Sequence, residues 1–213
     1  MTKIKKTIPV KPNSGRRVGL LGGSFNPAHD GHRLISEIAL ERLKLDEVWW
    51  LVSPQNPLKS TTDMAPLSVR LRDARKLVKG TRIRPTDLET RLGTRYTIDT
   101  LAALKARCPQ TRFVWLMGAD NLIEISRWRR WRSIFRSVAI AVLARPSYSL
   151  RALQCRAARR FKKARVRPVL AKSLSSRMPP AWVFLKTPRS ALSATRLRAE
   201  RARSRRPAGR SRS

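Results

Sequence analysis

Two histidines and two glycines near the start of the chain form a group that could act on a phosphate. Gly22 and Gly23 end a short apolar run that begins at Val18, and His29 and His32 follow after a proline-containing turn. A strand, a glycine-rich turn and a helix N-terminus make an anion site, because backbone N–H groups and the helix dipole favour negative charge. Histidines spaced i and i+3 share one face of the first helical turn, where imidazole can donate to phosphate oxygens. The alternative is a tight strand–helix turn in which the histidines only cap the helix.

The spacing of these residues indicates which kind of phosphate site they form. It is not the dinucleotide fingerprint Gly-x-Gly-x-x-Gly, and it lacks the Lys-Ser/Thr pair of the Walker loop. The run at residues 22–32 resembles instead the His-x-Gly-His signature of the nucleotidylyltransferase superfamily. Its longer form, Gly-Gly-Ser-Phe-Asn-Pro-x-His-x-Gly-His, is similar to that of the nicotinate-nucleotide adenylyltransferases. The resemblance implies an ATP-binding loop followed by two catalytic residues, namely Gly22, Gly23, Ser24 and Phe25, then His29 and His32.

Buried strands alternating with helices are expected to carry these motifs. Apolar runs predict the strands, and apolar residues at helical spacing predict the helices between them. Pro85 restricts one short strand to an edge of the sheet, and the right-handedness of strand–helix–strand units makes the first two strands parallel neighbours. The expected fold is α/β, with a doubly wound, mostly parallel sheet of the Rossmann-like type that binds ligands at the carboxyl ends of its strands. The predicted strands are residues 18–21, 48–52, 82–85, 113–117, 138–143 and 181–185, with helices over 34–43, 67–78 and 100–106.

A second motif of the same family follows the edge strand. Residues 89–100 resemble its Glu-x-x-x-x-x-x-Tyr-Thr-x-x-Thr element, which implies that Tyr96 and Thr97 receive the nicotinate carboxylate. A planar carboxylate needs two donors at a helix N-terminus, and Thr97 is expected to cap that helix. Trp128 aligns with the aromatic residue that stacks on the pyridine ring in the family, whereas Trp131 is expected to pack in the interior.

Gly118 and Asp120 match the Gly-x-Asp that the family carries after the strand at 113–117. Glycine permits close approach of a ligand to the backbone. The resemblance implies that both residues bind ATP, with the Asp120 carboxylate accepting from the ribose or the adenine amino group. Capping of the next helix is the alternative for Asp120.

Basic and hydroxyl side chains elsewhere match the family's phosphate contacts. Lys59 lies at the tip of a proline-containing loop, where it either reaches a triphosphate or remains solvated. Arg145 belongs to an Arg-Pro pair that lies near the mononucleotide in the family, with Ser147 in place of the usual glycine. The run at 192–198 resembles Ile-Ser-Ser-Thr-x-Ile-Arg, in which Ala194 replaces the second serine and removes one hydroxyl donor. It implies ATP phosphate contacts from Ser193, Thr195 and Arg198, whose guanidinium can bind phosphate in a bidentate manner.

The resemblance extends over residues 18–198 and implies one reaction. AMP is transferred from ATP to nicotinate mononucleotide, which gives deamido-NAD and pyrophosphate in NAD biosynthesis. His29, His32, Lys59 and Arg198 are the implied catalytic residues. Mg²⁺ is expected to bridge the phosphates, held by them and by water, because the sequence contains no carboxylate cage. The alternatives are a phosphopantetheine adenylyltransferase and a basic nucleic-acid-binding protein that has kept the fold.

The charge of the chain is extreme, with 48 Lys and Arg against 13 Asp and Glu among 213 residues and a net charge of +35. Such a protein binds nucleic acid non-specifically at low salt. We interpret the charge as the basic surface of an enzyme whose substrates carry phosphates. The expected organisation is a flexible basic leader over 1–17, one domain over 18–202 and a disordered Arg/Ser-rich tail over 203–213. Residues 150–167 predict one basic helix, and residues 168–180 predict irregular chain.

The two cysteines, Cys108 and Cys155, lie far apart and outside any Cys-x-x-Cys motif. They predict neither a zinc site nor a disulfide, and both are expected to be buried or half-buried in a reducing compartment. No secretory signal and no run of membrane-spanning length is recognisable. We therefore expect a cytoplasmic protein with no membrane, and the resemblance implies ATP and nicotinate mononucleotide as its partners.

Overall fold

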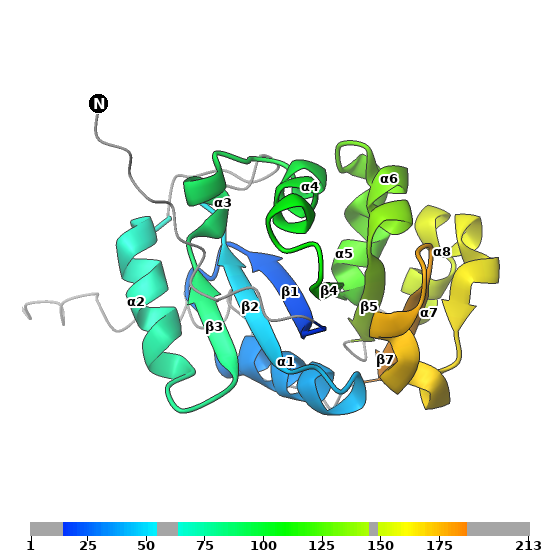
Figure 1. Cartoon of the computed structure of the whole chain (residues 1–213), viewed down its shortest axis with the longest axis horizontal. Helices are drawn as coiled ribbons and strands as arrows, with labels where there is room; N and C mark the ends of the chain where they lie inside the picture. Colours follow the sequence, from blue (N-terminus) through cyan, green and yellow to red (C-terminus); the bar gives the residue numbers. More distant parts are fainter. Residues whose placement is uncertain (1–14, 55–63, 145–148, 187–213) are drawn as a thin grey trace, which may run out of the picture.

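The computed structural model describes residues 15–54, 64–144 and 149–186, which build a seven-stranded sheet with helices on both faces (Figure 1). The strand order is β3-β2-β1-β4-β5-β7-β6, and each neighbouring pair is parallel. The prediction of a doubly wound parallel sheet is confirmed. The strands are β1 (Arg17–Gly23), β2 (Glu47–Val52), β3 (Ile83–Thr86), β4 (Arg112–Gly118), β5 (Ala139–Ala144), β6 (Arg165–Val166) and β7 (Trp182–Lys186).

The chain reverses its direction across the sheet after β3. From β1 it proceeds to β2 and β3 on one side, and then crosses to β4 and the remaining strands on the other. Leu20 of β1 lies opposite Trp49 of β2 and Trp115 of β4. In an open parallel sheet, ligands bind at such a switch point, in the crevice outside the carboxyl ends of the strands. β3 lies at the edge, as Pro85 predicts.

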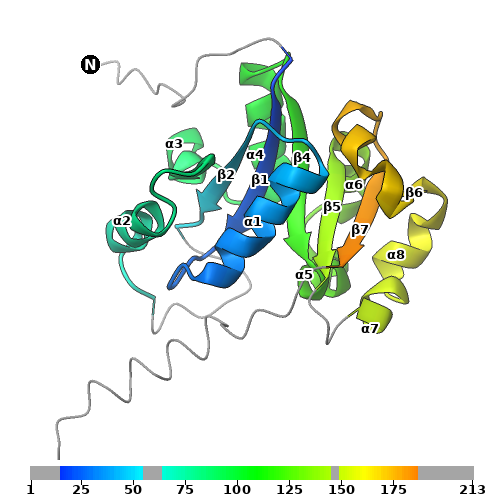
Figure 2. The ribbon, with the colours of Figure 1, turned by 90° about the horizontal axis from the view of Figure 1, so that it is seen from below.

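Helices cover the two faces of the sheet unequally (Figure 2). One face is covered by α1, α2 and the 3₁₀ helix η4, and the other by α3 to α8. Each layer is apolar where it meets the sheet, so the sheet is buried on both faces, as parallel sheets usually are. The helices are α1 (Asp30–Arg42), α2 (Leu67–Leu77), α3 (Leu88–Leu92), α4 (Thr97–Arg107), α5 (Ala119–Glu124), α6 (Trp131–Ser137), α7 (Ser149–Leu153), α8 (Arg156–Arg160), η1 (Ile125–Arg127), η3 (Lys162–Ala164) and η4 (Pro168–Ser176).

The paired tryptophans of β2 show how the sequence produces both layers. Successive side chains of a strand point to opposite faces. Trp49 therefore packs in the layer of α3 to α8, where its ring lies 5.9 Å from that of Phe113, and Trp50 packs in the layer of α1. Both side chains are almost completely buried. Burial of a large apolar side chain contributes roughly 1.5–3 kcal/mol, so these two residues anchor both layers to the strand.

The prediction of one basic helix over residues 150–167 is wrong. The chain forms α7 and α8 instead, followed by η3 and β6. Cys155 breaks the helix with an extended backbone (φ −66°, ψ 163°), and its Sγ accepts from the N–H of Ala158 at 3.5 Å. The same thiol donates to the carbonyl of Leu122 in α5 at 3.3 Å. This tertiary contact explains why helical spacing alone did not predict the break.

Two boundaries also differ from the predictions. Residues 168–180 contain η4, which Pro168 can begin because the first N–H groups of a helix have no partner within it. β1 begins at Arg17, and Arg16 pairs with Glu47 at 3.1 Å, so the predicted leader does not extend through residue 17. Residues 1–14 and 187–213, which hold the rest of the leader and the tail, lie outside the described residues.

Two simpler expectations are met among the described residues. Cys108 is buried, Cys155 is half-buried, and both are free thiols. Trp131 packs in the interior, with its ring 6.3 Å from that of Phe135 and 6.0 Å from that of Phe161. None of the described helices has the length and apolar character needed to cross a membrane.

Candidate active site

The predicted histidine pair lies at the N-terminus of α1, directly beyond the carboxyl end of β1. His29 is the N-cap residue, with an extended backbone (φ −149°, ψ 167°), and His32 lies in the first turn. The two imidazole ring centres are 3.9 Å apart, which confirms that the rings share one side of the helix. The N–H of His29 donates to Nδ1 of His32 at 3.3 Å, so the capping alternative also describes part of the arrangement.

This hydrogen bond determines which nitrogen of His32 can donate. A ring nitrogen that accepts carries no proton, so in the neutral ring the proton of His32 is on Nε2. Nε2 is then a hydrogen-bond donor at a helix N-terminus, where the dipole already favours an anion. His29 is only 4% exposed, whereas His32 is half-buried.

Phe25, together with Trp50 and Ser36, which the sequence did not single out as site residues, holds His32 in place. The ring of Phe25 stacks on Trp50 at 4.7 Å and lies 4.8 Å from the ring of His32. Nε1 of Trp50 donates to the hydroxyl of Ser36 at 2.8 Å, and that hydroxyl donates to the carbonyl of His32 at 2.8 Å. The side chain of Phe25 is buried, so only its backbone is available to a nucleotide.

The glycines of this site make room for side chains of the protein itself. A Cβ at Gly22 would lie 2.9 Å from the ring of Trp115, and one at Gly23 would lie 3.3 Å from the ring of Phe25. A Cβ at Gly118 would collide with Oδ1 of Asp120. Close approach of a ligand to the backbone, which the sequence indicated as the reason for glycine here, is therefore only part of the explanation.

Asp120 does not cap α5. The N-cap is Gly118 (φ −73°, ψ 162°), and Asp120 lies in the first turn of the helix. Its Oδ1 is buried and accepts no hydrogen bond within the part of the chain that the structure describes. A buried acceptor without a donor costs about 1–3 kcal/mol, and a hydroxyl or amino group of a ligand would remove that cost.

Two of the predicted nicotinate residues lie at the N-terminus of α4. Tyr96 is the N-cap residue (φ −111°, ψ 141°) and Thr97 is the first residue of the helix, so the expectation that Thr97 caps it is wrong. The guanidinium of Arg129 lies 4.7 Å from the centre of the Tyr96 ring. The neighbouring Trp128 packs edge-on against Trp115, with 6.4 Å between ring centres and an angle of 88°. Trp115 also covers Gly22, so the phosphate loop and Trp128 share one packing partner.

Five predicted site residues lie outside the described residues. They are Lys59, Arg145, Ser193, Thr195 and Arg198.

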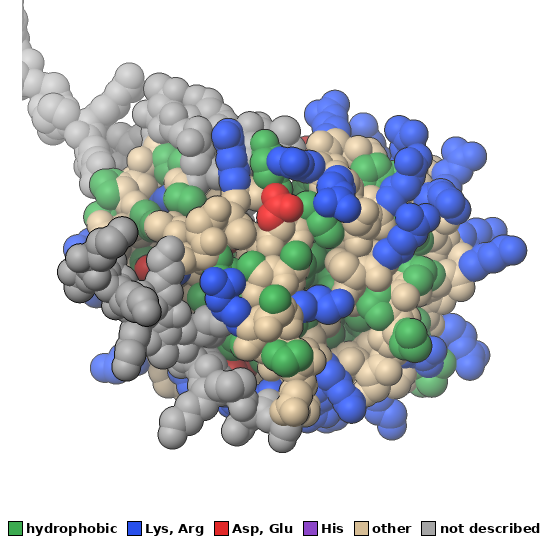
Figure 3. Space-filling model, turned by 45° about the horizontal axis from the view of Figure 1, so that its top comes forward, with side chains coloured by type: hydrophobic (Ala, Val, Ile, Leu, Met, Phe, Trp, Pro, Cys, Tyr) green, Lys and Arg blue, Asp and Glu red, His purple; other side chains and the backbone are tan. Residues whose placement is uncertain are grey.

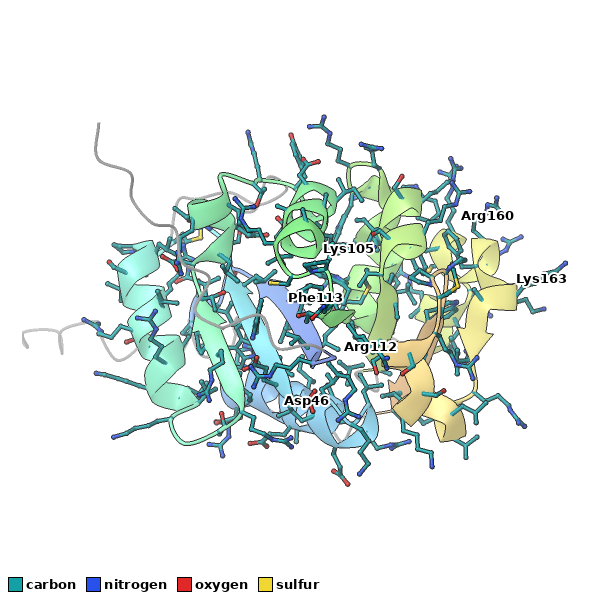
Figure 4. All side chains as sticks on the ribbon, in the orientation of Figure 1. Asp46, Lys105, Arg112, Phe113, Arg160 and Lys163 are labelled. Atoms are coloured by element: carbon teal, nitrogen blue, oxygen red, sulfur yellow. The ribbon has the colours of Figure 1, made fainter. Side chains whose placement is uncertain are left out.

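A hollow of about 550 Å³ lies at the opposite end of the strands, beside Asp46 and Arg112, which Figure 4 labels. Its lining includes the first residues of β1 and β4, Arg17 and Arg112, together with Asp46. Arg17 and Asp46 pair with each other at 2.8 Å, and Arg112 donates to the hydroxyl of Ser176 at 2.9 Å. The amino ends of parallel strands are not where ligands of such sheets bind, so this hollow is not the candidate site.

The C-terminal part of the chain carries positive charge without any acid. No Asp or Glu stands between Glu124 and Glu200. Within residues 125–186, every Lys and Arg that the structure describes is exposed. Figure 3 shows Lys and Arg side chains gathered over the end of the molecule where Figure 1 places α6 to α8. The field of this surface attracts anionic molecules, including nucleotides.

Comparisons with known proteins agree with this geometry. A sequence profile of the family described as cytidylyltransferase-like matches residues 20–200. A curated relative from Cereibacter sphaeroides, named "probable nicotinate-nucleotide adenylyltransferase", is 56% identical over 182 residues, which cover 85% of this chain and 96% of the relative. A relative of the same name from Brucella abortus is 50% identical over 181 residues, covering 85% of this chain and 93% of the relative.

A solved structure shows the same fold. It is the nicotinic acid mononucleotide adenylyltransferase of Plasmodium falciparum complexed with NaAD, with a TM-score of 0.66 over 86% of this chain and 83% of that chain. Its sequence is 17% identical, so this likeness concerns the fold alone. The identity to curated relatives over most of both chains places this protein in the nicotinate-nucleotide adenylyltransferase family.

Proposed function

We infer that this protein transfers AMP from ATP to nicotinate mononucleotide and releases deamido-NAD and pyrophosphate, as a step of NAD biosynthesis. The curated relatives carry this activity in their names, and a structural neighbour is complexed with NaAD. The observation that carries the assignment is the pair of imidazoles, 3.9 Å apart at the N-terminus of α1 and beside the switch point of the sheet.

The proposed mechanism needs no covalent intermediate with the enzyme. The phosphate of the mononucleotide is ionised at neutral pH and is itself the nucleophile, which attacks the α-phosphorus of ATP in line with the leaving pyrophosphate. Catalysis then consists of positioning the two substrates and neutralising charge as it develops on phosphate oxygens. We assign this neutralisation to the helix N-terminus and to His29 and His32, with Nε2–H of His32 as the defined donor.

The remaining residues fall into two half-sites. On the ATP side we place the backbone of Gly22, Gly23, Ser24 and Phe25, together with Gly118 and the carboxylate of Asp120. On the nicotinate side we place Trp128 and the N-terminus of α4 at Tyr96 and Thr97, where the first N–H groups of the helix have no partner within it. Lys59, Arg145, Ser193, Thr195 and Arg198 remain predictions from the family motifs.

We propose Mg²⁺ as the ion that accompanies ATP. Phosphate oxygens and water would be its ligands, because Mg²⁺ keeps several waters and is usually bound together with substrate phosphates. When bound, the ion neutralises charge on the phosphates. We place the reaction in the cytoplasm, because the free thiols of Cys108 and Cys155 fit a reducing compartment.

A pyrophosphate-release assay tests the assignment. Purified protein is given ATP and Mg²⁺ with nicotinate mononucleotide, the amide mononucleotide or phosphopantetheine, each in a separate reaction. Rapid release with nicotinate mononucleotide and slower release with the other two is expected. Release with phosphopantetheine alone would assign the chain to another branch of the superfamily.

A further inference from the structure

Arg70 of α2 is a buried cation whose hydrogen bonds all go to backbone carbonyls. Its guanidinium donates to the carbonyls of Ser24 at 2.5 Å, Ser53 at 2.8 Å, Pro54 at 3.3 Å and Ala65 at 2.8 Å. It is 3% exposed, and burial lowers the pKa of Arg70. The planar fork of donors therefore joins the loop after β1 to the loop after β2 and to the start of α2.

Glu89 of α3 is a buried carboxyl that contacts the same loop from the other side. Burial raises the pKa of Glu89, and the neighbouring hydroxyls of Ser53 and Thr100 lower it in part. The hydroxyl of Thr100 lies 2.9 Å from that of Thr94 and donates to the carbonyl of Tyr96 at 3.2 Å. Glu89 is thereby connected to the N-terminus of α4, where the nicotinate half-site is proposed.

Ser53 lies between these two groups and uses all of its polar atoms. Its N–H donates to the carbonyl of Gly23 at 2.9 Å, and its carbonyl accepts from Arg70. Its hydroxyl lies beside the carboxyl of Glu89 and favours the charged form of that group. A continuous series of polar contacts therefore runs from the phosphate loop, through Ser53 and Glu89, to Thr100.

We propose that Ser53 is a positioning residue which, together with Arg70 and Glu89, fixes the phosphate loop relative to the N-terminus of α4. We call these three residues the Ser53 relay. The proposal rests on the proposed function, because it assigns ATP to one end of the relay and nicotinate mononucleotide to the other. The relay sets the separation of the two half-sites and thus the alignment of the attacking phosphate with the α-phosphorus.

Burying Arg70 and Glu89 is unfavourable on its own. Desolvation of a cation or a carboxyl costs several kcal/mol, which an apolar side chain of similar volume would avoid. Hydrogen bonds to Ser24 and Ser53 offset part of this cost and give directional restraint that apolar packing would not supply. Because transfer between two bound substrates is sensitive to misplacement of about 1 Å, such restraint affects the rate directly.

Steady-state kinetics of Ser53→Ala, Ser53→Thr and the control Ser137→Ala test the relay. The hydroxyl of Ser137 makes a local bond to the carbonyl of Ile134 at 3.0 Å in α6, so its loss is the same chemical change away from the relay. Ser53→Ala is expected to lower kcat about 10-fold or more, while KM for each substrate stays within about 3-fold. Ser53→Thr keeps the hydroxyl and should restore most of kcat. Normal kcat in a fully folded Ser53→Ala would overturn the proposal.

Glu89→Ala adds a readout that does not depend on activity. Hydrogen exchange is measured for the amides of residues 18–27, which lie across Ser53 from the substitution. The relay predicts faster exchange at these amides in Glu89→Ala but not in Ser137→Ala. It also predicts that the kcat of the double variant Ser53→Ala/Glu89→Ala is no lower than that of Ser53→Ala alone. Unchanged exchange would overturn the relay. If the wild type is inactive with nicotinate mononucleotide but Glu89→Ala still shows faster exchange, only the proposed function is rejected.

Discussion

The backbone N–H of His29 donates to Nδ1 of His32, so one histidine orients the imidazole of the other. The hydrogen bond closes the first turn of α1 and leaves Nε2 of His32 as the donating nitrogen. It also means that His32 has two separable roles, one in capping the helix and one in binding phosphate. Variants that keep one role and remove the other can therefore distinguish them.

Trp128 is expected to contribute to mononucleotide binding and not to ATP binding. Trp128→Ala should raise KM for nicotinate mononucleotide roughly 10-fold or more, since stacking on an aromatic ring contributes about 1–3 kcal/mol. Trp128→Phe keeps an aromatic face and should restore most of the affinity. Initial rates with each substrate varied in turn measure both constants. Equal increases of KM for both substrates would remove Trp128 from the nicotinate half-site.

Glu89 makes the free energy of unfolding depend on pH. Burial raises the pKa of Glu89 from 4.5 to about 7, so between these values the folded protein holds a proton that the unfolded chain has released. Stability therefore falls as the pH rises through this range, by on the order of 3 kcal/mol, and then levels off.

Glu89→Gln cannot ionise and should lack this dependence. Urea unfolding of both proteins at about pH 5 and about pH 8 measures the difference. The variant should gain stability relative to the wild type at the higher pH. The same change with pH in both proteins would show that Glu89 titrates normally in the folded state.

The acid-free cationic surface is expected to dominate non-specific binding of nucleic acid. Arg160, Lys162 and Lys163 lie in or beside α8, and Figure 4 shows Arg160 and Lys163 pointing outward at one end of the molecule. Replacing all three by Gln should weaken binding of a DNA duplex. The slope of log affinity against log salt concentration should fall by the amount that corresponds to up to about three lost phosphate contacts.

A matched control removes the same charge from the other end of the sheet. Arg75, Lys76 and Lys79 are also exposed, but Asp73 lies in the same helix, α2, as two of them. Their replacement by Gln is expected to weaken duplex binding less. Equal losses in the two triple variants would mean that net charge, and not its distribution, governs the binding. Pyrophosphate release should be unchanged in both.

Local sequence patterns predicted the buried strands and the turn that carries the histidine pair, because both form from residues close together in the chain. Residues 18–21 and 48–52 are apolar runs, and both lie in buried parallel strands. The histidine pair was predictable because its placement is also local: the glycines and both histidines lie within a short stretch of the chain that forms one strand–helix turn. The break at Cys155 was not predictable, because it depends on a thiol contact to Leu122, 33 residues away.

Arg70 shows why part of the site escaped prediction. An arginine in an amphipathic helix normally faces solvent, and its helical position gives no sign of burial. It is buried because the loops after β1 and β2 converge on it, 46 and 17 residues away in the chain. Glu89 stands in a recognised motif, but its contact with Ser53 required the tertiary structure.

The catalytic role of the histidine pair is tested most directly by His32→Gln. Glutamine at the third helical position can accept from the N-cap N–H, so it preserves the cap while it removes the imidazole. We predict a fall in kcat for pyrophosphate release of about 10²–10³-fold, with a melting temperature close to that of the wild type. A folded His32→Gln variant with the wild-type kcat would contradict the role of the imidazole in catalysis.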